Sequence, residues 1–258
     1  MKILKGGVGR YNLPQIIMKK SFKFLLTAFT ILAIVGCNGK QDTNKIYKVG
    51  TTAEYPPFEY LDNGKIVGYD VDVIEEISKK TGIKYEWQDM NFDGLIAALQ
   101  TKKIDIVIAG ISSTPEREKV VNFSIPYHEA KTAFLMNKDN PMTMDNLEGK
   151  KFGVDLGTTN ETTARSIKGA NVVAFSSTGG TLIALKNKKV DCLIIDETVA
   201  EEYIKNNPEL AVFGYGPGEG KSIAFNKDDE KLRDDFDKAL EELEKDGTLK
   251  KLQEKYKI

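Results

Sequence analysis

The chain has 258 residues, of which 41% are hydrophobic and 29% charged, which is enough to bury a large core and form two compact units. The first 36 residues hold six basic residues and no acidic one. The rest of the chain, with 31 basic and 38 acidic residues, therefore has a formal net charge of −7. This acidic balance argues against a nucleic-acid partner, for which a basic excess is expected.

The N-terminus has the pattern of an export signal. Lysines at positions 19, 20 and 23 precede apolar residues 24–36, a run of thirteen that is shorter than the roughly 20 residues of a bilayer-spanning helix. Met18, directly before two of these lysines, is the predicted translation start. Residues 34–37, Ile-Val-Gly-Cys, resemble the lipobox of bacterial lipoproteins, in which the cysteine is acylated. A plain secretory signal is the alternative.

Cys37 is thus the predicted lipidation site, and residues 1–37 are the predicted signal peptide. We expect an exported protein that is lipid-anchored to the outer face of the cell membrane or in the periplasm, with residues 38–44 as a polar tether. Cys192, the only other cysteine, lies in an apolar run and is predicted to be a buried, unreactive thiol. The single histidine, His128, is predicted to lie in a loop without a catalytic role, and no metal or cofactor site is expected.

Beyond the tether, the spacing of apolar residues predicts alternating strands and helices. The order strand, helix, strand predicts parallel sheets whose faces are covered by helices, an α/β fold. The predicted strands are residues 46–51, 66–69, 104–109, 151–155, 172–175 and 190–195. The predicted helices are residues 71–80, 92–102, 115–121, a helix from residue 160, and residues 181–188, 197–206, 229–245 and 249–256.

An internal sequence repeat indicates two lobes with the same arrangement of strands and helices. Seven residues around predicted strand 104–109 recur 86 positions later, around predicted strand 190–195. In this alignment Gly110 corresponds to Asp196, so two equivalent strand ends present a bare backbone in one lobe and a carboxylate in the other. Open α/β sheets bind ligands at such strand ends. The recurring pairs are Gly94 and Gly180, Ala98 and Ala184, Leu99 and Leu185, Lys102 and Lys188, Lys103 and Lys189, Asp105 and Asp191, and Ile108 and Ile194.

A predicted helix that carries an arginine in its first turn follows strand 104–109. Thr114 is a capping residue, and Pro115 suits the first helical position. The helix dipole disfavours a cation there, so Arg117 beside free backbone N–H groups indicates a bound anion. The alternative is a surface arginine paired with Glu116 or Glu118.

The second lobe repeats this pattern at residues 157–160, Gly-Thr-Thr-Asn, which follow a strand and open a helix. Backbone N–H groups and two hydroxyls converge there, although ordinary N-capping needs only one of these residues. Together with Arg117 and Asp196, the set offers a cation and two helix ends for an anion, and a carboxylate for a cation. A free α-amino acid is the simplest ligand with this charge pattern.

Seven segments together carry a family resemblance. They are GTTAEYPPF at residues 50–58, GYDVDVIEEI at 68–77, Phe92-Asp93, AGISSTPER at 109–117, GTTN at 157–160, Asp196-Glu197 and Asp246-Gly247-Thr248. The chain resembles the polar-amino-acid branch of the bacterial solute-binding proteins that feed ABC importers. This implies a two-lobed periplasmic-binding-protein (Venus-flytrap) fold of two parallel or mixed sheets flanked by helices. The implied hinge crossings lie near residues 129–132 and 218–222, so residues 45–131 and 222–258 form the first lobe and residues 132–221 the second.

The resemblance also implies roles for individual residues. Arg117 grips the ligand α-carboxylate, and Ser112, Thr158 and Thr159 add hydrogen bonds. Asp196 and the Gly110 carbonyl hold the α-ammonium. Tyr55 and Phe92 sandwich the ligand side chain, although aromatic residues of this kind could equally belong to the core.

The chain departs from the family pattern at a position that bears on specificity. Thr52 stands where relatives that bind lysine, arginine and ornithine have an aspartate. Asp155, at a predicted strand end, is expected to face the ligand tail in its place, whereas Glu54 reads as a solvated loop charge. Asn160 could hydrogen-bond with a polar tail. A carboxylate facing the tail predicts a basic ligand, arginine or lysine, with glutamine or another polar amino acid as the alternative.

The implied mechanism is a hinged clamp, because Arg117 and Asp196 lie in different lobes and a zwitterion reaches both only when they close. The predicted function is the substrate-binding component of an ABC amino-acid importer, a monomer that delivers a free L-amino acid to a membrane permease. A dehydratase-like enzyme and a sensory receptor module on the same fold are the alternatives. An enzyme needs a positioned general acid, whereas Arg117 with Asp196 favours binding without catalysis.

Overall fold

The computed structural model describes residues 45–258. The predicted signal peptide, Cys37 and the tether lie outside this range. The described residues form two five-stranded sheets and one three-stranded sheet with intervening helices, which confirms the α/β class. None of the helices in this part of the chain is both long enough and apolar enough to cross a membrane.

The first five-stranded sheet, in the order β5-β1-β6-β13-β7, combines strands from both ends of the described chain. β1 pairs in parallel with β5 and β6, and β13 pairs antiparallel with β6 and β7. The sheet is therefore mixed, and it is completed by a strand that follows the second sheet in sequence. Its strands are β1 (Ile46–Thr51), β5 (Lys84–Asp89), β6 (Ile106–Val107), β7 (Val121–Phe123) and β13 (Ala224–Asn226).

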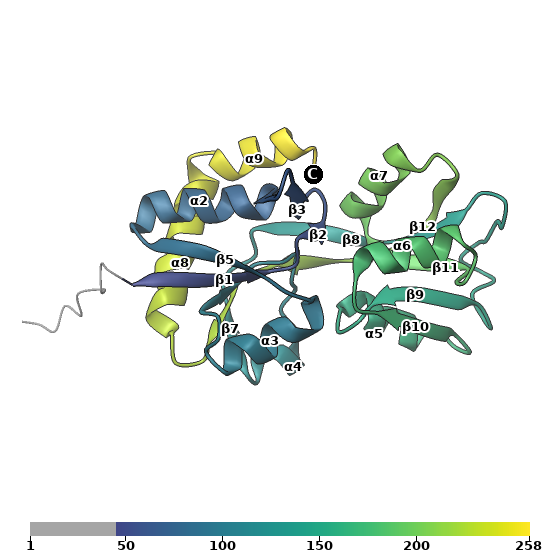
Figure 1. The fold of residues 1–258 in the computed structure, drawn as a ribbon, viewed down its shortest axis with the longest axis horizontal. Coiled ribbons are helices and arrows are strands. Elements are labelled where there is room, and N and C mark those ends of the chain that lie inside the picture. Colours follow the sequence, from purple (N-terminus) through teal and green to yellow (C-terminus); the bar gives the residue numbers. More distant parts are fainter. Residues whose placement is uncertain (1–44) are drawn as a thin grey trace, which may run out of the picture. The chain divides into compact units, whose positions relative to one another are not determined.

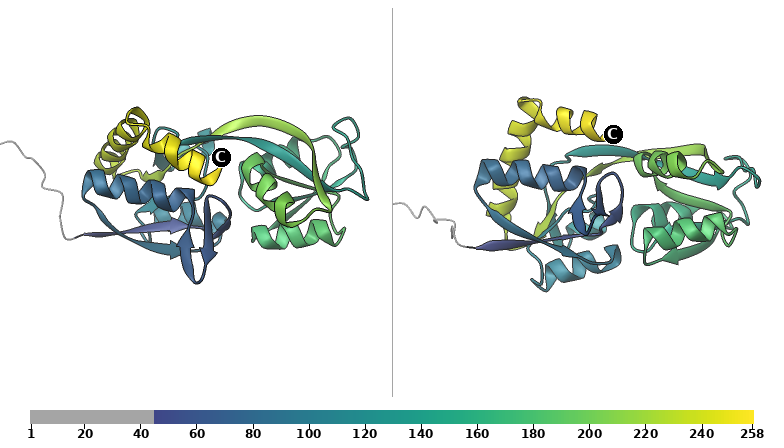
Figure 2. Two further views of the ribbon diagram at one scale, coloured as in Figure 1. Left: turned by 90° about the horizontal axis from the view of Figure 1, so that it is seen from above. Right: turned by 45° about the horizontal axis from the view of Figure 1, so that its top comes forward.

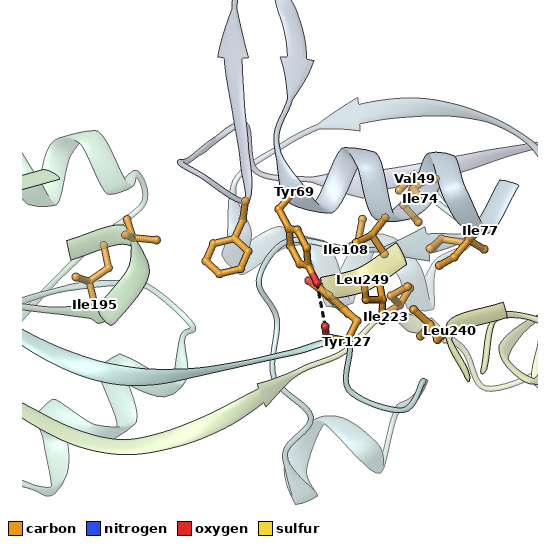
Figure 3. Close-up of a cluster of buried hydrophobic side chains, with 14 of the residues drawn as sticks. Val49, Tyr69, Ile74, Ile77, Ile108, Tyr127, Ile195, Ile223, Leu240 and Leu249 are labelled. Carbon is orange, nitrogen blue, oxygen red and sulfur yellow. Dashed lines mark hydrogen bonds between the residues drawn. The ribbon is translucent and has the colours of Figure 1, made fainter. Parts of the chain in front are cut away.

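Helices cover both faces of this sheet (Figure 1). Successive strand side chains point to opposite faces, so Ile106 joins the core formed with α2 and α8, whereas Val107 joins a second cluster with α3. At the start of α2, the Tyr69 hydroxyl donates to the Tyr127 carbonyl oxygen at 3.0 Å within the larger core (Figure 3). The helices are α2 (Tyr69–Thr81), α3 (Phe92–Gln100), α4 (Pro115–Glu118), α8 (Glu230–Lys245) and α9 (Thr248–Tyr256).

The small antiparallel sheet β2-β3-β4 leads into α2 and fixes where this helix begins. The N–H groups of Tyr69 and Asp70 donate to the carbonyl oxygens of Pro57 and Phe58, both at 2.9 Å. Gly68 has a φ of 135°, and a Cβ at this position would lie 2.1 Å from the Phe58 carbonyl oxygen. Because only glycine fits this approach, it allows the turn that buries Asp70 completely. The strands are β2 (Glu54–Tyr55), β3 (Glu59–Asp62) and β4 (Lys65–Val67).

The second five-stranded sheet has the order β10-β9-β11-β8-β12. β9 pairs in parallel with β10 and β11, while β8 pairs antiparallel with β11 and β12. β8 and β12 run side by side from the pair Leu210 and Asn137 to the pair Lys221 and His128, with two breaks in register (Figure 2). The elements are β8 (His128–Asn137), β9 (Lys151–Asp155), β10 (Asn171–Phe175), β11 (Cys192–Asp196) and β12 (Leu210–Lys221), with helices α5 (Thr159–Ser166), α6 (Thr178–Lys186) and α7 (Glu197–Asn206).

The internal sequence repeat has a structural reason. Lys102 and Lys188 lie two residues past the ends of α3 and α6, and each adopts a φ of 57°. Asp105 and Asp191 then make the same pair of bonds to a neighbouring backbone, accepting an N–H with the carboxylate and donating their own N–H to a carbonyl. The partners are Lys48 for Asp105 and Lys151 for Asp191, at 2.8 to 2.9 Å. The recurring residues therefore build one helix-to-strand connection twice.

The structure corrects several predicted elements. The predicted helix 115–121 is the four-residue helix α4 and gives way to β7, and the predicted strand 104–109 forms only the short ladder of β6. The predicted helix 181–188 begins earlier, at Thr178, because the Ser177 hydroxyl caps it by accepting the Gly180 N–H at 3.1 Å. His128 starts strand β8 and does not lie in a loop. Cys192 is completely buried, as predicted.

Substituting Gly68 by alanine should lower the free energy of unfolding, because the new Cβ would meet the Phe58 carbonyl oxygen and the backbone conformation suits only glycine. We expect a loss of at least 1–3 kcal/mol in urea unfolding, the approximate cost of forcing a side chain into this region. Gly94→Ala is the matched control, because Gly94 lies in α3 and a Cβ added there would have no atom within 4 Å. It should gain about 0.5–1 kcal/mol. Equal effects of the two substitutions would contradict the role of Gly68.

Candidate functional site: a cavity lined by both lobes

One cavity is lined by residues from both five-stranded units. The structure brings together around it all eleven residues that the sequence predicted for ligand binding, namely Thr52, Tyr55, Phe92, Gly110, Ser112, Arg117, Asp155, Thr158, Thr159, Asn160 and Asp196. Four lining residues were missed at the sequence level, namely Glu59, Ala109, Thr178 and Lys221.

The Arg117 guanidinium is held by backbone carbonyls from both lobes. Nη1 donates to the Ser112 carbonyl oxygen at 2.6 Å, and Nη2 donates to the Gly157 carbonyl oxygen at 2.8 Å. The guanidinium carbon lies 5.5 Å from the Phe92 ring centroid, a cation–π distance. Burial lowers the pKa of Arg117, while the Glu219 carboxylate opposes this shift.

No carboxylate among residues 45–258 forms an ion pair with Arg117, so pairing with Glu116 or Glu118 is the wrong alternative. The Glu118 carboxylate instead accepts a hydrogen bond from the Ser113 hydroxyl. Because α4 has only four residues, its dipole is too short to explain the site, and the half-buried guanidinium of Arg117 itself is the anion-attracting feature.

The start of α5 is a capping box. The Thr158 hydroxyl accepts the Glu161 N–H at 3.1 Å, and the Glu161 carboxylate accepts the Gly157 N–H at 2.7 Å. The N-capping alternative is therefore present in the structure, and one of the predicted anion-binding N–H groups is already engaged. Thr158 and Thr159 still line the cavity, so an anion there would meet these two residues and not the Gly157 N–H.

Asp196, at the end of β11, is 3% exposed and fully engaged. Its Oδ1 accepts from the Asn160 amide nitrogen at 3.2 Å, and its Oδ2 lies 2.6 Å from the Lys221 Nζ. The Asn160 amide oxygen in turn accepts from the Thr132 hydroxyl at 3.2 Å. Asn160 therefore orients the Asp196 carboxylate, a role that differs from the predicted contact with a ligand tail.

Lys221 is the most consequential residue that the sequence did not single out. It ends β12 and is 3% exposed, an uncommon state for a lysine. Besides Asp196, its Nζ contacts the Ser112 hydroxyl at 3.3 Å. Its ammonium thus links a residue of the first lobe to the carboxylate of the second. Its only sequence signal was its position within the predicted hinge crossing 218–222.

A pair of buried carboxyl groups adjoins this ion pair. Asp70 Oδ2 accepts the Gly110 N–H at 3.0 Å and the Tyr127 hydroxyl at 2.9 Å, while its Oδ1 has no protein partner among the described residues. Glu59 is completely buried, and both its carboxyl oxygens are likewise without a partner there. Burial and the neighbouring Asp70 raise the pKa of Glu59 well above its usual range, and burial raises the pKa of Asp70 to about 6. One shared proton gives both carboxyl groups a partner.

Asp155 lies at the end of β9 and lines the same cavity. Its two carboxylate oxygens accept from the Thr178 hydroxyl at 2.6 Å and the Thr181 hydroxyl at 2.5 Å. Burial raises the pKa of Asp155, and these two hydrogen bonds oppose that shift. The Glu54 carboxylate accepts the Gly179 N–H at 3.5 Å near the same helix start. Two acidic side chains thus lie close to the first turn of α6.

The remaining predicted residues shape the cavity wall. The Thr52 hydroxyl donates to the Met90 carbonyl oxygen at 3.0 Å. The Tyr55 hydroxyl accepts the Asp196 N–H at 3.4 Å, and the Tyr55 ring stacks on Phe58 with 5.9 Å between centroids. Tyr55 is therefore both a core aromatic and a cavity wall. Residues 45–258 contain no group of three or more His, Cys, Asp or Glu side chains arranged to hold a metal ion.

A cavity between two α/β units, lined by a half-buried arginine of one unit and a buried carboxylate of the other, defines a binding protein for small charged solutes. The chain belongs to the bacterial extracellular solute-binding proteins, family 3, whose family model matches residues 47–257. Two of its curated relatives are described as binding proteins.

Two curated relatives align over almost their whole length. The probable histidine-binding protein of Campylobacter jejuni is 40% identical over 255 residues, covering 93% of this chain and 100% of the relative. The arginine-binding extracellular protein ArtP of Bacillus subtilis is 36% identical over 251 residues, covering 93% and 98%. Among solved structures, an ancestral arginine-binding protein bound to arginine is 42% identical with a TM-score of 0.78, covering 82% of this chain and 97% of that one. The arginine-, lysine-, histidine-binding protein ArtJ of Geobacillus stearothermophilus is 35% identical with a TM-score of 0.78, covering 82% and 95%.

Asp70 should make stability depend on pH. The Asp70 carboxyl group loses its proton near pH 3.8 in the unfolded chain and near pH 6 in the folded protein. Between these pH values the folded state therefore binds one more proton than the unfolded state. The Asp70 contribution to the free energy of unfolding therefore falls as the pH rises from about 4 to about 6, by on the order of 3 kcal/mol.

Asp70→Asn should remove this contribution, because the amide oxygen can still accept from Gly110 and Tyr127 but cannot titrate. Urea unfolding at intervals from pH 4 to pH 7 measures the difference between the wild-type and variant profiles. Asp62→Asn, at the exposed end of β3, is the matched control and should follow the wild-type profile. A wild-type profile for Asp70→Asn would show that Asp70 is not the titrating group.

Proposed function

We propose that this protein binds a free basic L-amino acid, arginine or lysine, and delivers it to an ABC permease. The observation that carries the proposal is the opposed arrangement of buried charges around one cavity. Arg117, without an ion-pair partner among the described residues, marks the end for an anion, and Asp196 and Asp155 mark two positions for cations.

Arg117 is proposed to bind the ligand α-carboxylate. Its guanidinium is oriented by carbonyl oxygens of both lobes, and it forms no ion pair with an acidic residue among those described, although the Glu219 carboxylate favours its charged form. A carboxylate gains charge-assisted hydrogen bonds there without breaking an existing ion pair. Ser112, Thr158 and Thr159 line the same region and supply further hydrogen-bond groups.

The α-ammonium is proposed to bind Asp196 and the Gly110 carbonyl oxygen. The Asp196 carboxylate is oriented by Asn160, and Gly110 is fixed by its N–H bond to Asp70. Asp196 ends β11, and Gly110 lies three residues beyond β6, at the position that the internal sequence repeat aligns with Asp196. A ligand that contacts Arg117 and Asp196 at once contacts both lobes, which is the differential contact that would favour a closed clamp.

The ligand tail is proposed to reach Asp155, with Glu54 nearby. The threonine hydroxyls that hold Asp155 support its ionised form inside the cavity, and an ionised carboxylate favours guanidinium or ammonium over a second carboxylate. The names of the relatives, which include arginine-, lysine- and histidine-binding proteins, support a basic ligand. Glutamine or another polar amino acid is the alternative that the ligand panel below distinguishes.

We further propose that Cys37 is acylated and anchors the protein at the outer face of the membrane. The lipobox-like residues 34–37 support this, and membership of an extracellular solute-binding family supports export. A monomer is sufficient for the proposed clamp, because every predicted binding residue comes from one chain.

A thermal-shift panel of the twenty amino acids, on protein freed of carried ligand, tests the function. At free ligand about 1,000 times the dissociation constant, binding should add roughly 4 kcal/mol and raise the midpoint by roughly 8 to 16 °C. Arginine or lysine should give the largest shift. No shift with any L-amino acid would refute amino-acid binding, and a shift with glutamine alone would refute a basic ligand.

Arg117→Ala should abolish this shift, because the ligand carboxylate loses its charge-assisted partner. A loss of roughly 2–4 kcal/mol corresponds to an affinity about 30- to 1,000-fold lower. Arg233→Ala is the control, since Arg233 lies in α8 outside the cavity and pairs with Asp234. Isothermal titration with arginine measures both variants. An unchanged affinity for Arg117→Ala would exclude Arg117 as the carboxylate anchor.

Asp155→Asn should lower the affinity for arginine by about 10- to 100-fold and leave the affinity for glutamine nearly unchanged, because only a charged tail gains from the carboxylate. Asp139→Asn, on the exposed surface in a pair with Lys188, should change neither. Competition between arginine and glutamine gives the ratio directly. Equal losses for both ligands would mean that Asp155 supports the fold of the site and does not read the tail.

A further inference from the structure

The position proposed for the ligand α-ammonium is already occupied by a side chain of the protein. Lys221 Nζ lies 2.6 Å from Asp196 Oδ2, and the two side chains are 3% and 4% exposed. An aspartate buried to this extent is costly without a cation, and Lys221 supplies one. Lys221 is therefore already paired with the carboxylate that is proposed to bind the ligand ammonium.

A ligand ammonium and the Lys221 ammonium cannot both pair closely with Asp196 without strong repulsion. Asn160 already donates to Asp196 Oδ1 and Lys221 pairs with Oδ2, so a ligand ammonium would have to share this carboxylate with both groups. In a buried site, two like charges at contact distance repel more strongly than in water. Lys221 must therefore move when an amino acid binds, and its flexible four-carbon stem allows this.

Glu59 is the carboxyl group to which the Lys221 ammonium can move. It lines the same cavity and is completely buried, and apart from the proton that it shares with Asp70 it has no hydrogen-bond partner among the described residues. The charged and titratable groups that face it are Asp70 on α2, Asp196 on β11 and Lys221 on β12, with Tyr127 before β8. Lys221 is the only cation among these groups, and its charge favours the ionised form of Glu59.

We propose that Lys221 is a resident counter-ion that occupies Asp196 in the ligand-free protein and transfers to Glu59 when the α-ammonium of an amino acid takes its place. This rests on the proposed function and makes Lys221 and Glu59 determinants of affinity for α-amino acids. The Ser112 hydroxyl, which contacts Nζ at 3.3 Å, can hold the ammonium during the exchange.

The proposed exchange of Lys221 from Asp196 to Glu59 releases one proton. Without ligand, Glu59 and Asp70 share a proton, because two adjacent and completely buried carboxyl groups cannot both ionise without a paired cation; burial and the neighbouring carboxyl accordingly raise the pKa of Glu59. When Lys221 arrives, the Glu59 proton leaves to the solvent and the carboxylate pairs with the lysine. One ligand ammonium thus enters as one proton leaves. His128, whose pKa is lowered to about 4 by burial and by Lys221, is neutral at pH 7 and does not contribute.

Isothermal titration with L-arginine at pH 7, in two buffers with different ionisation enthalpies, measures this proton. We use L-glutamine if arginine gives no heat. Wild-type protein should release about one proton for each ligand bound, and its affinity should rise with pH. The analogue of arginine without its α-amino group should bind without proton release, because Lys221 then stays on Asp196. No heat with either amino acid would refute the proposed function, whereas binding without proton release would refute this inference alone.

Two variants separate the exchange from a merely structural ion pair. Glu59→Gln keeps the shape of neutral Glu59 but has no acidic proton, so proton release should disappear while arginine still binds. Lys221→Met removes the competing cation, so the affinity for L-arginine should rise by about tenfold or more and proton release should again disappear. Lys251→Met, on the exposed face of α9, is the matched control and should behave as wild type.

Two outcomes would overturn the inference, namely proton release that persists in Glu59→Gln, or a Lys221→Met protein that folds and binds arginine more weakly than wild type. If Lys221→Met does not fold, Glu59→Gln and the analogue lacking the α-amino group still decide between exchange and a fixed pair.

Discussion

Burial destabilises a charged side chain unless partners hold it, and this constraint shapes the site. Asp196 has Lys221 and Asn160, Asp70 has the Gly110 N–H and the Tyr127 hydroxyl, and Asp155 has two threonine hydroxyls. Arg117 differs, since neutral carbonyls hold its guanidinium and the Glu219 carboxylate acts on it without forming an ion pair. In the proposed function, a ligand carboxylate supplies the missing ion pair.

The two lobes divide this work because they repeat one structural unit with a single chemical difference at the strand end. The same aspartate-to-backbone bonds fix the entry to β6 and to β11, so their ends are presented in equivalent ways. Gly110 offers backbone groups in one lobe, while Asp196 offers a carboxylate in the other. The same helix-to-strand connection, used twice, thus presents backbone groups in one lobe and a carboxylate in the other.

Much of this could be predicted from local sequence, and the remainder depends on long-range contacts. Strands β1 and β9 and helix α7 have the predicted bounds because apolar spacing and caps act within a few residues. β8 and β12 were missed because the glycine-rich β12 is ordered mainly by its partner strand. Among site residues, Arg117 and Asp196 lie beside strand ends, which sequence can show. Lys221 and Glu59 are buried by segments distant in sequence, and no local pattern distinguishes them from surface charges.

The pairing of β8 with β12 has a mechanical consequence. Two antiparallel strands joined by a hydrogen-bond ladder resist twisting against each other more than a pair of independent linkers would, while the two register breaks and the glycines of β12 leave places where the ribbon can bend. Motion about this ribbon is then close to a single bending direction. A solute would therefore enter along one rim of the cavity, and the residues on that rim would meet it first.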